Sequence, residues 1–255
     1  MNTGAIVRGA IGALVPAAAA EALTRSGVLG LAPFSEVAVR FFALAADGGF
    51  LLNAADTVTA WAAGLALATV AAVLTGVLLG SVPFLNTAAG VVVEFLRPIP
   101  SVALIPLAIL VFGAETQMKI ALICYAAAWP ILLNTIYALR DVDPLAKEAL
   151  RSFGFGRLAV LWRVSLPSAA PFVATGVRVS AAIGLVVVIG AELYGGGERG
   201  IGVVLIQARS GGGADDVMLA VALWAGVFGL AVNALLQRLS RTAFRWHAVR
   251  TGDLR

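Results

Sequence analysis

The chain has 255 residues, of which 60% are hydrophobic and only 13% charged, with a formal net charge of +4. A soluble chain of this size carries about twice that charged fraction, so the composition excludes an ordinary soluble domain. The single cysteine, Cys124, leaves no disulfide framework, and the single histidine, His247, disfavours a histidine-based metal site or catalytic triad. The excess of basic residues is concentrated in a central loop and at the ends of the chain. This distribution is typical of residues that set the orientation of a membrane protein, and it gives no reason to expect binding to nucleic acid.

The N-terminal part has two features. Residues 1–23 contain Arg8 and an apolar run interrupted by Pro16. This pattern fits a retained first membrane helix or a cleaved signal peptide, and we favour the retained helix because an even number of helices places both termini on one side. Ser35–Leu52 is expected to form an interfacial helix. Its expected apolar contacts are Val37, Phe41, Phe42 and Leu44.

Five further apolar segments are long enough to cross a bilayer, which requires about 20 residues per helix. They are Thr57–Gly80, Thr87–Gly113, Ile120–Leu139, Ser168–Glu192 and Val217–Leu236. With the first helix retained, the chain is predicted to be an all-α polytopic membrane protein of about six transmembrane helices. Small residues allow helix backbones to approach closely in lipid. The glycines expected to do this are Gly64, Gly76, Gly80, Gly176, Gly184 and Gly190.

Shorter segments connect these spans. Ser81–Thr87 and Glu115–Lys119 are predicted to be turns. The loop 193–215 is rich in glycine, and within it Ile201–Gln207 is expected to form a short buried helix or to dip into the membrane.

Charged residues inside the spans are candidates for a transport pathway. Glu94 and Arg97 lie three residues apart and can pair across one helical turn, and three prolines follow them. The preferred interpretation places this turn at the cytoplasmic interface, and the alternative is a broken polar element lining a pathway. Arg178 either faces such a pathway or pairs structurally, and Glu192 is expected at the outer interface, for packing or for contact with a partner.

The stretch 143–167 predicts a compact helical hairpin between two spans. Asp143 can cap a helix that begins at Pro144, and Gly154 suits the left-handed position after its end. Four apolar side chains fall on one side of this helix, with two cations on another. The apolar residues are Leu145, Ala149, Leu150 and Phe153, and the cations are Lys147 and Arg151.

Basic residues predict the orientation by the positive-inside rule. Five lie in or beside the hairpin: Arg140, Lys147, Arg151, Arg157 and Arg163. Five lie in the C-terminal tail: Arg238, Arg241, Arg245, Arg250 and Arg255. The hairpin and both termini are therefore predicted to be cytoplasmic.

The hairpin resembles the EAA loop of bacterial ABC-importer permeases. The family pattern is E-A-A, three residues, G, nine residues, an aliphatic residue, any residue and L-P. This sequence matches with Glu148-Ala149-Leu150, Gly154, Val164 and Leu166-Pro167, and it departs only in the leucine at the third position. The segments Phe95–Gly113, Pro130–Pro144 and Thr175–Leu193 are similar to the nitrate, sulfonate and taurine branch, and the resemblance covers roughly Asn53–Arg241.

The resemblance implies a type I ABC-importer transmembrane fold with a cytoplasmic coupling helix. Residues 1–53 would hold the first helix and the interfacial segment, 54–241 the permease domain, and 242–255 a basic cytoplasmic tail. The implied partners are a second permease subunit, in a homodimer, two ATPase subunits and a periplasmic or lipoprotein substrate-binding protein, in the bacterial cytoplasmic membrane. The implied coupling residues are Leu145, Lys147, Glu148, Ala149, Leu150, Arg151, Phe153, Gly154, Leu166 and Pro167.

The energy source is expected on another chain. No phosphate-binding G-x-x-x-x-G-K-[ST] motif occurs in the sequence, so ATP and Mg²⁺ would be bound by the partner ATPase, with no cofactor and no catalysis here. The implied solute is a small anion of the nitrate, sulfonate, taurine or bicarbonate type. A thiamine-precursor pyrimidine or an aromatic carboxylate is the alternative. A stand-alone secondary transporter would need paired acids or repeated broken helices, and no internal repeat is found.

Overall fold

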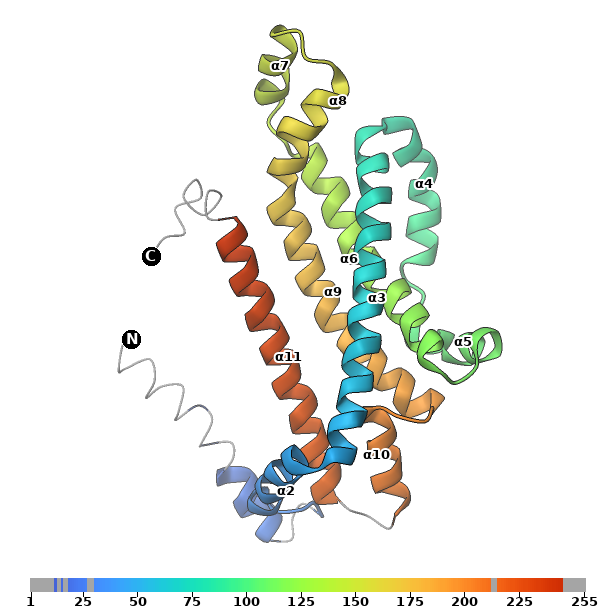
Figure 1. Ribbon diagram of the computed structural model, residues 1–255, viewed down its shortest axis with the longest axis vertical. Coiled ribbons are helices and arrows are strands. Elements are labelled where there is room, and N and C mark those ends of the chain that lie inside the picture. The colour runs from blue at the N-terminus through green and yellow to red at the C-terminus, as the bar shows by residue number, and fades with distance from the viewer. Residues whose placement is uncertain (1–11, 13–14, 16–17, 27–29, 212–214, 245–255) are drawn as a thin grey trace.

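The computed structural model describes residues 12, 15, 18–26, 30–211 and 215–244 (Figure 1). Within these residues the chain is helical throughout, without strands. The short segments are α2 (Phe34–Ala46), η1 (Ser101–Leu104), α5 (Ile105–Phe112), α7 (Pro144–Ser152), α8 (Arg157–Val160), η2 (Leu161–Ser165) and α10 (Ile201–Ser210). The longer helices are α3 (Gly48–Ser81), α4 (Pro83–Leu96), α6 (Thr116–Arg140), α9 (Leu166–Gly195) and α11 (Asp215–Ala243).

Four helical stretches of the described chain are long and apolar enough to cross a membrane. They are α3, α6, α11 and the continuous stretch Arg157–Gly195, and the bent pair formed by α4 with η1 and α5 adds a fifth span if it is counted as one. Four of the five spans predicted after residue 56 are thereby confirmed, and the fifth, Thr87–Gly113, corresponds to the bent pair. The predicted first helix, residues 1–23, lies mostly outside the described residues.

α6 lies between α3 and α9 and packs closely against both, and the glycines set the spacing. A Cβ at Gly64 of α3 would stand 2.7 Å from Ile123 Cβ, and one at Gly76 would stand 2.7 Å from Thr135 Cβ. On the other side of α6, a Cβ at Gly176 of α9 would be 3.1 Å from the carbonyl oxygen of Pro130. The close approach predicted from these glycines is confirmed.

Two side-chain hydrogen bonds reinforce this three-helix core. The buried Ser180 hydroxyl donates to the carbonyl oxygen of Ala127 at 2.6 Å, and the Trp61 indole donates to that of Ala181 at 2.9 Å. The prediction for Gly190 was wrong within this chain, because no atom lies within 4 Å of a Cβ placed there.

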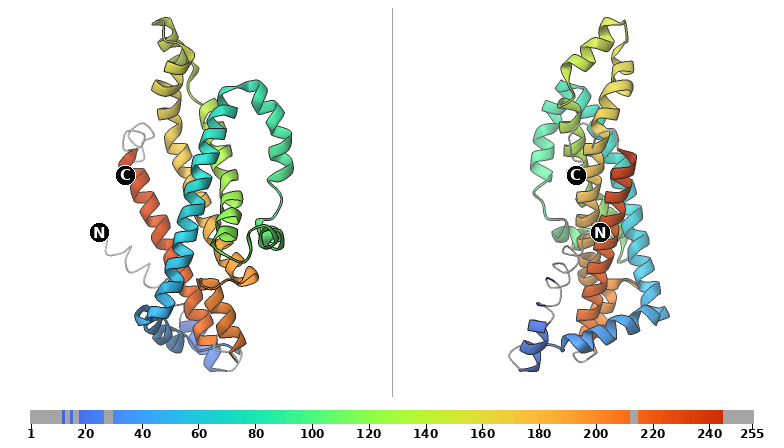
Figure 2. Two further views of the ribbon diagram at one scale, coloured as in Figure 1. Left: turned by 45° about the vertical axis from the view of Figure 1, so that its right-hand side comes forward. Right: turned by 90° about the vertical axis from the view of Figure 1, so that its left-hand side faces the viewer.

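The span with three prolines is broken. α4 begins at Pro83, so the predicted turn Ser81–Thr87 shrinks to a break at Val82. After Leu96 the chain bends by 78°, and α5 runs across the bundle whereas α4 runs along it (Figures 1 and 2). At the break, the carbonyl oxygen of Leu96 accepts the Ile99 N–H at 3.1 Å and the Tyr125 hydroxyl of α6 at 2.7 Å, so the end of α4 is tied to α6.

Two other predicted boundaries were wrong. The expected helix Ser35–Leu52 is divided at Asp47, whose carboxylate accepts the Gly49 N–H at 2.8 Å and caps α3. Val37 and Leu44 of α2 are buried as expected, but Phe42 is 71% exposed. The predicted turn Glu115–Lys119 is mostly the first turn of α6.

α10 confirms the expected short helix in the glycine-rich loop, and its first turn is buried against α9 and α3. At the end of the bundle opposite the hairpin, α2, α10 and the start of α11 gather (Figure 1). This end is called the α10 end below, and the opposite one the hairpin end.

Replacing Gly64 with alanine should lower the unfolding temperature of the purified chain in detergent. The new Cβ would overlap Ile123, and overpacking of this kind costs about 1–3 kcal/mol. The matched control is Gly226→Ala in α11, because no atom lies within 4 Å of a Cβ at that position. Equal unfolding temperatures for the two variants would contradict glycine-dependent packing of α3 on α6.

Candidate functional site

The hairpin, residues 143–167, stands at one end of the molecule (Figure 1). The Asp143 carboxylate accepts the Leu145 N–H at 2.9 Å, so the predicted cap of α7 is confirmed. Gly154 has φ +81° and is the left-handed residue after the helix, also as predicted. Two backbone hydrogen bonds close this end, from Gly154 to Arg151 and from Phe155 to Leu150. They form the double pattern of a Schellman motif, which requires the positive φ.

The two faces of α7 differ in what they contact. Leu145 is 73% and Phe153 82% exposed, and Ala149 is exposed between them, whereas Leu150, the fourth residue of the predicted stripe, is half-buried. The stripe of Leu145, Ala149 and Phe153 lacks a partner among the described residues. Lys147 and Arg151 point away from it, toward the turn between α3 and α4, where both line a cavity. The stripe and the cations are therefore on opposite sides of one short helix.

The rest of the hairpin joins α7 to the membrane core. Leu166 and Pro167 begin α9, and Leu166 packs against a small core that contains Ala138 and Leu139. The segment from Arg157 onward continues through the π-helical η2 into α9 without interruption. A displacement of the hairpin can therefore be transmitted along a continuous helix.

Glu94 and Arg97 lie at the break between α4 and α5 and line a cavity of about 580 Å³. Tyr137 and Arg140 of α6 and Asn86 of α4 line the same cavity. No ion pair joins Glu94 to Arg97 among the described residues, so the predicted pairing was wrong. The structure brings these two residues together with a second arginine, Arg140, which sequence reasoning had assigned only to topology.

Arg178 is half-buried in α9, two residues after Gly176. In the described part of the chain it forms no hydrogen bond or ion pair, including with Glu94 or Glu192, the partners that the structural alternative named. The Arg178 guanidinium is thus paired with neither Glu94 nor Glu192.

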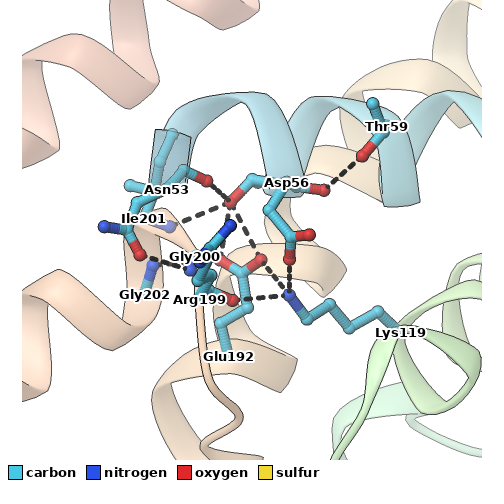
Figure 3. A network of polar contacts seen from close by, with 10 residues as sticks. Asn53, Asp56, Thr59, Lys119, Glu192, Arg199, Gly200, Ile201 and Gly202 are labelled. Atoms are coloured by element: carbon cyan, nitrogen blue, oxygen red, sulfur yellow. Dashed lines mark hydrogen bonds and ion pairs between the residues drawn. The ribbon is translucent and has the colours of Figure 1, made fainter. Parts of the chain in front are cut away.

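Glu192 is completely buried near the α10 end, within a network of polar groups from four segments (Figure 3). Lys119 of α6, itself only 2% exposed, contacts Glu192 at 3.0 Å and Asp56 of α3 at 2.7 Å. Its third donor goes to the carbonyl oxygen of Arg199 at 2.8 Å. All three N–H groups of the ammonium are therefore used.

The network also fixes the loop between α9 and α10. The Glu192 carboxylate accepts the Thr57 hydroxyl at 2.9 Å and the Gly202 N–H at 3.0 Å. Any side chain at Gly200, which has φ +150°, would overlap that carboxylate. The Glu192 carboxylate is therefore fully engaged within the chain and lies away from the molecular surface.

Sequence reasoning missed Lys119, Asp56 and Thr57 as members of this network. Lys119 was assigned to a polar turn at the surface, although a lysine followed by twenty residues without a charge was a usable signal. Asp56 and Thr57 lie on α3, Lys119 on α6 and Glu192 on α9, so no local spacing relates the groups that the network joins.

The fold and this arrangement of charges define a polytopic helical membrane protein, with the features of a transport permease. The family described as binding-protein-dependent transport system inner membrane component matches residues 64–245, and the chain belongs to that family. Its relatives are transport permease subunits and not catalytic enzymes, and the same holds for this chain.

Individual relatives support the assignment. The taurine transport system permease protein of Escherichia coli is 33% identical over 231 residues, which cover 85% of this chain and 80% of the relative. A putative ABC transporter permease of Methanocaldococcus jannaschii is 30% identical, covering 81% and 77%. A bicarbonate transport system permease of Synechococcus elongatus is 29% identical, covering 78% and 71%.

A solved structure confirms the fold. The MetNI methionine ABC transporter in an inward-facing conformation matches with a TM-score of 0.65 and 21% identity, covering 75% of this chain and 94% of the other. The predicted type I ABC-importer transmembrane fold is thereby confirmed.

Replacing Lys119 with methionine should destabilise the chain strongly. The change leaves Glu192 buried without its cation, and breaking a buried pair costs about 3–5 kcal/mol. Thermal unfolding in detergent measures the effect, and Lys119→Met combined with Glu192→Gln should recover part of the loss.

Arg40→Met is the matched control, because it removes an ion pair of 2.8 Å, to Asp216, that is partly exposed to solvent. Such pairs contribute about 0–1 kcal/mol. If Lys119→Met were no less stable than Arg40→Met, the buried network would not hold α3, α6 and α9 together.

Proposed function

We propose that the chain forms, with a second copy, the membrane pathway of an ATP-driven importer, and that the hairpin is its contact with a separate ATPase. The observation that carries this proposal is the exposed apolar stripe of α7. Leu145 and Phe153 are mostly exposed on a helix that projects beyond the ends of α3 and α6, where no part of the described chain covers them. Apolar side chains displayed in this way on a short helix fit a groove on a partner protein.

The hairpin also has the rigidity that coupling needs. Its caps at Asp143 and Gly154 fix both ends of α7, and the Arg163 guanidinium lies 4.7 Å from the centre of the Phe155 ring. Movement of an ATPase pair would displace α7 as a rigid unit, and this displacement would be transmitted through η2 to α9. The partner would bind ATP and Mg²⁺, and the work done on the hairpin would switch the pathway between its two access states.

The orientation follows from the positive-inside rule. The hairpin end, with its five basic residues, would face the cytoplasm, and the α10 end would face a substrate-binding protein outside. The ion pairs agree with this assignment: in the described chain, those of Arg25, Arg40 and Lys119 all lie toward the α10 end. The basic residues of the hairpin, in contrast, form no ion pair within the described chain, so their positive charge is not neutralised by it.

The transported solute is proposed to be a small anion. The names of several relatives specify bicarbonate, nitrate, taurine and aliphatic sulfonates, which are anions or carry an anionic group. Arg178 is the half-buried cation in α9 without a partner among the described residues, and an unpaired guanidinium within a span suits a passing anion. Arg97 and Arg140 beside the 580 Å³ cavity would extend the favourable potential toward the hairpin end.

Phe153→Ser and Gly154→Asp should abolish uptake in proteoliposomes that contain the full importer, while the chain still inserts in the membrane. The first removes a phenyl ring that is 82% exposed, and the second places a charge and a side chain at a left-handed position. ATP hydrolysis should lose its stimulation by the loaded binding protein.

Phe84→Ser is the matched control, because Phe84 is 78% exposed at the same end of the bundle but lies on α4. It should keep most of the uptake. Glu148→Arg, at the rim of the stripe, should behave like Phe153→Ser. Normal uptake by the hairpin variants would refute the contact with an ATPase.

Arg178→Ala should lower the rate of anion uptake tenfold or more while leaving the ATPase bound, whereas Arg178→Lys should retain a substantial part of the rate because it keeps the charge. Uptake assays and co-purification on the same samples measure both effects. Loss of ATPase binding or of assembly with Arg178→Ala would instead assign the arginine to packing.

A further inference from the structure

A second cavity lies beneath the hairpin, between α7, α8 and the turn that joins α3 to α4. Its volume is about 440 Å³. Three cations from two helices line it, Lys147 and Arg151 from α7 and Arg157 from α8. The hydroxyl-bearing residues Ser81 and Ser165 also line it. This set of residues is called the basic pocket below.

The charge of the basic pocket is not balanced by the chain. Its lining includes no aspartate or glutamate, and no ion pair of its three cations occurs in the described structure. Lys147 donates one hydrogen bond, to the carbonyl oxygen of Leu139 at 3.2 Å, which leaves two of its three donors free for a ligand. Two guanidinium groups and an ammonium around a small cavity suit a phosphate group.

The position of the pocket fits the headgroup layer of a membrane. Gly80, Ser81 and Val82 at its wall mark the end of the span α3, and Leu139 lies one residue before the end of α6. The pocket is therefore level with the ends of two spans. Basic pockets between membrane helices on the cytoplasmic side are typical sites for anionic lipid headgroups.

Exposed apolar side chains adjoin the cations on the same segment. Leu158, which lines the pocket, is 68% exposed, and Trp162, one turn further along, is 65% exposed. A tryptophan in this position is typical of the membrane interface. A lipid with its phosphate in the pocket would thus find apolar surface for the start of its acyl chains.

We propose that the basic pocket binds the phosphate of an anionic phospholipid of the cytoplasmic leaflet, and that this lipid links the hairpin to the ends of α3 and α6. The inference rests on the proposed function for the orientation of the chain. It assigns the two faces of α7 separate roles: the stripe of Leu145, Ala149 and Phe153 contacts the ATPase, and Lys147 and Arg151 contact the lipid. A partner carboxylate is a poorer candidate, since these cations face the membrane-proximal turn.

The test uses the purified full chain without its partners, so that its result is independent of the ATPase contact. The chain is incubated in detergent with equal amounts of phosphatidylglycerol and phosphatidylcholine, and the retained lipid is identified by native mass spectrometry. The expected result is selective retention of phosphatidylglycerol. Arg151→Gln with Arg157→Gln should reduce the retention roughly tenfold, because each cation near a membrane surface adds substantially to the attraction.

The control pair is Arg238→Gln with Arg241→Gln, which removes the same charge from the end of α11, outside the pocket lining. It should leave retention unchanged. Ser81→Glu is a second variant that keeps all three cations and places a carboxylate at the exposed edge of the pocket, and it should also reduce retention. Equal losses in the test and control pairs would overturn the proposal, because they would show unspecific attraction.

Two further outcomes separate the possible ligands. If 10 mM inorganic phosphate displaced the phosphatidylglycerol, the pocket would be a site for the free anion and the lipid assignment would fail. If Arg151→Gln with Arg157→Gln kept the lipid but lost the ATPase in a separate co-purification, the cations would belong to the protein contact, and the proposal would again be overturned. If Phe153→Ser did not uncouple transport, that result would contradict only the proposed ATPase contact. The measured lipid retention would not depend on it.

Discussion

The rest of the structure depends on the close approach of α3 and α9 to the central helix α6. Apolar helices gain little from meeting each other in lipid, so backbone contact at small residues has to supply the packing. Gly64 and Gly76 provide it on one side of α6, and Gly176 provides it on the other. Because the same three helices extend from the buried network to the hairpin, their contact fixes how the two ends of the molecule stand relative to each other.

The buried network complements this packing with directional contacts. Glu192 and Lys119 are both removed from solvent. Burying either charge is tolerated only because the other charge pairs with it and because further hydrogen bonds satisfy their remaining donors and acceptors. The network joins α3, α6, α9 and the loop before α10 at one point. In the proposed mechanism this end is the fixed part of each subunit, and the hairpin, held by few contacts, is the part that a partner moves.

The predictability of an element depended on how local its causes are. The hairpin was predicted almost completely, including the cap at Asp143 and the left-handed Gly154, because both effects act within a few residues. The break at Asp47 was missed because α2 and the start of α3 have the same apolar character, and only the cap separates them. The prolines indicated a broken span after Arg97, but neither the bend of 78° nor the Tyr125 hydrogen bond could be read from their positions.

The sequence alone determined the class of the protein, four of its membrane spans and the family, since hydrophobic length, charge asymmetry and the spacing of Glu148, Gly154 and Pro167 are all properties of the linear chain. Only the tertiary structure decided which charges meet. It paired Glu192 with Lys119, left Arg178 without a partner in the described chain, and turned Lys147 and Arg151 away from the apolar stripe of α7. The physical reason is that a charge in a membrane protein is stabilised by whatever the packing brings within about 3–4 Å, and packing joins residues that no sequence interval relates.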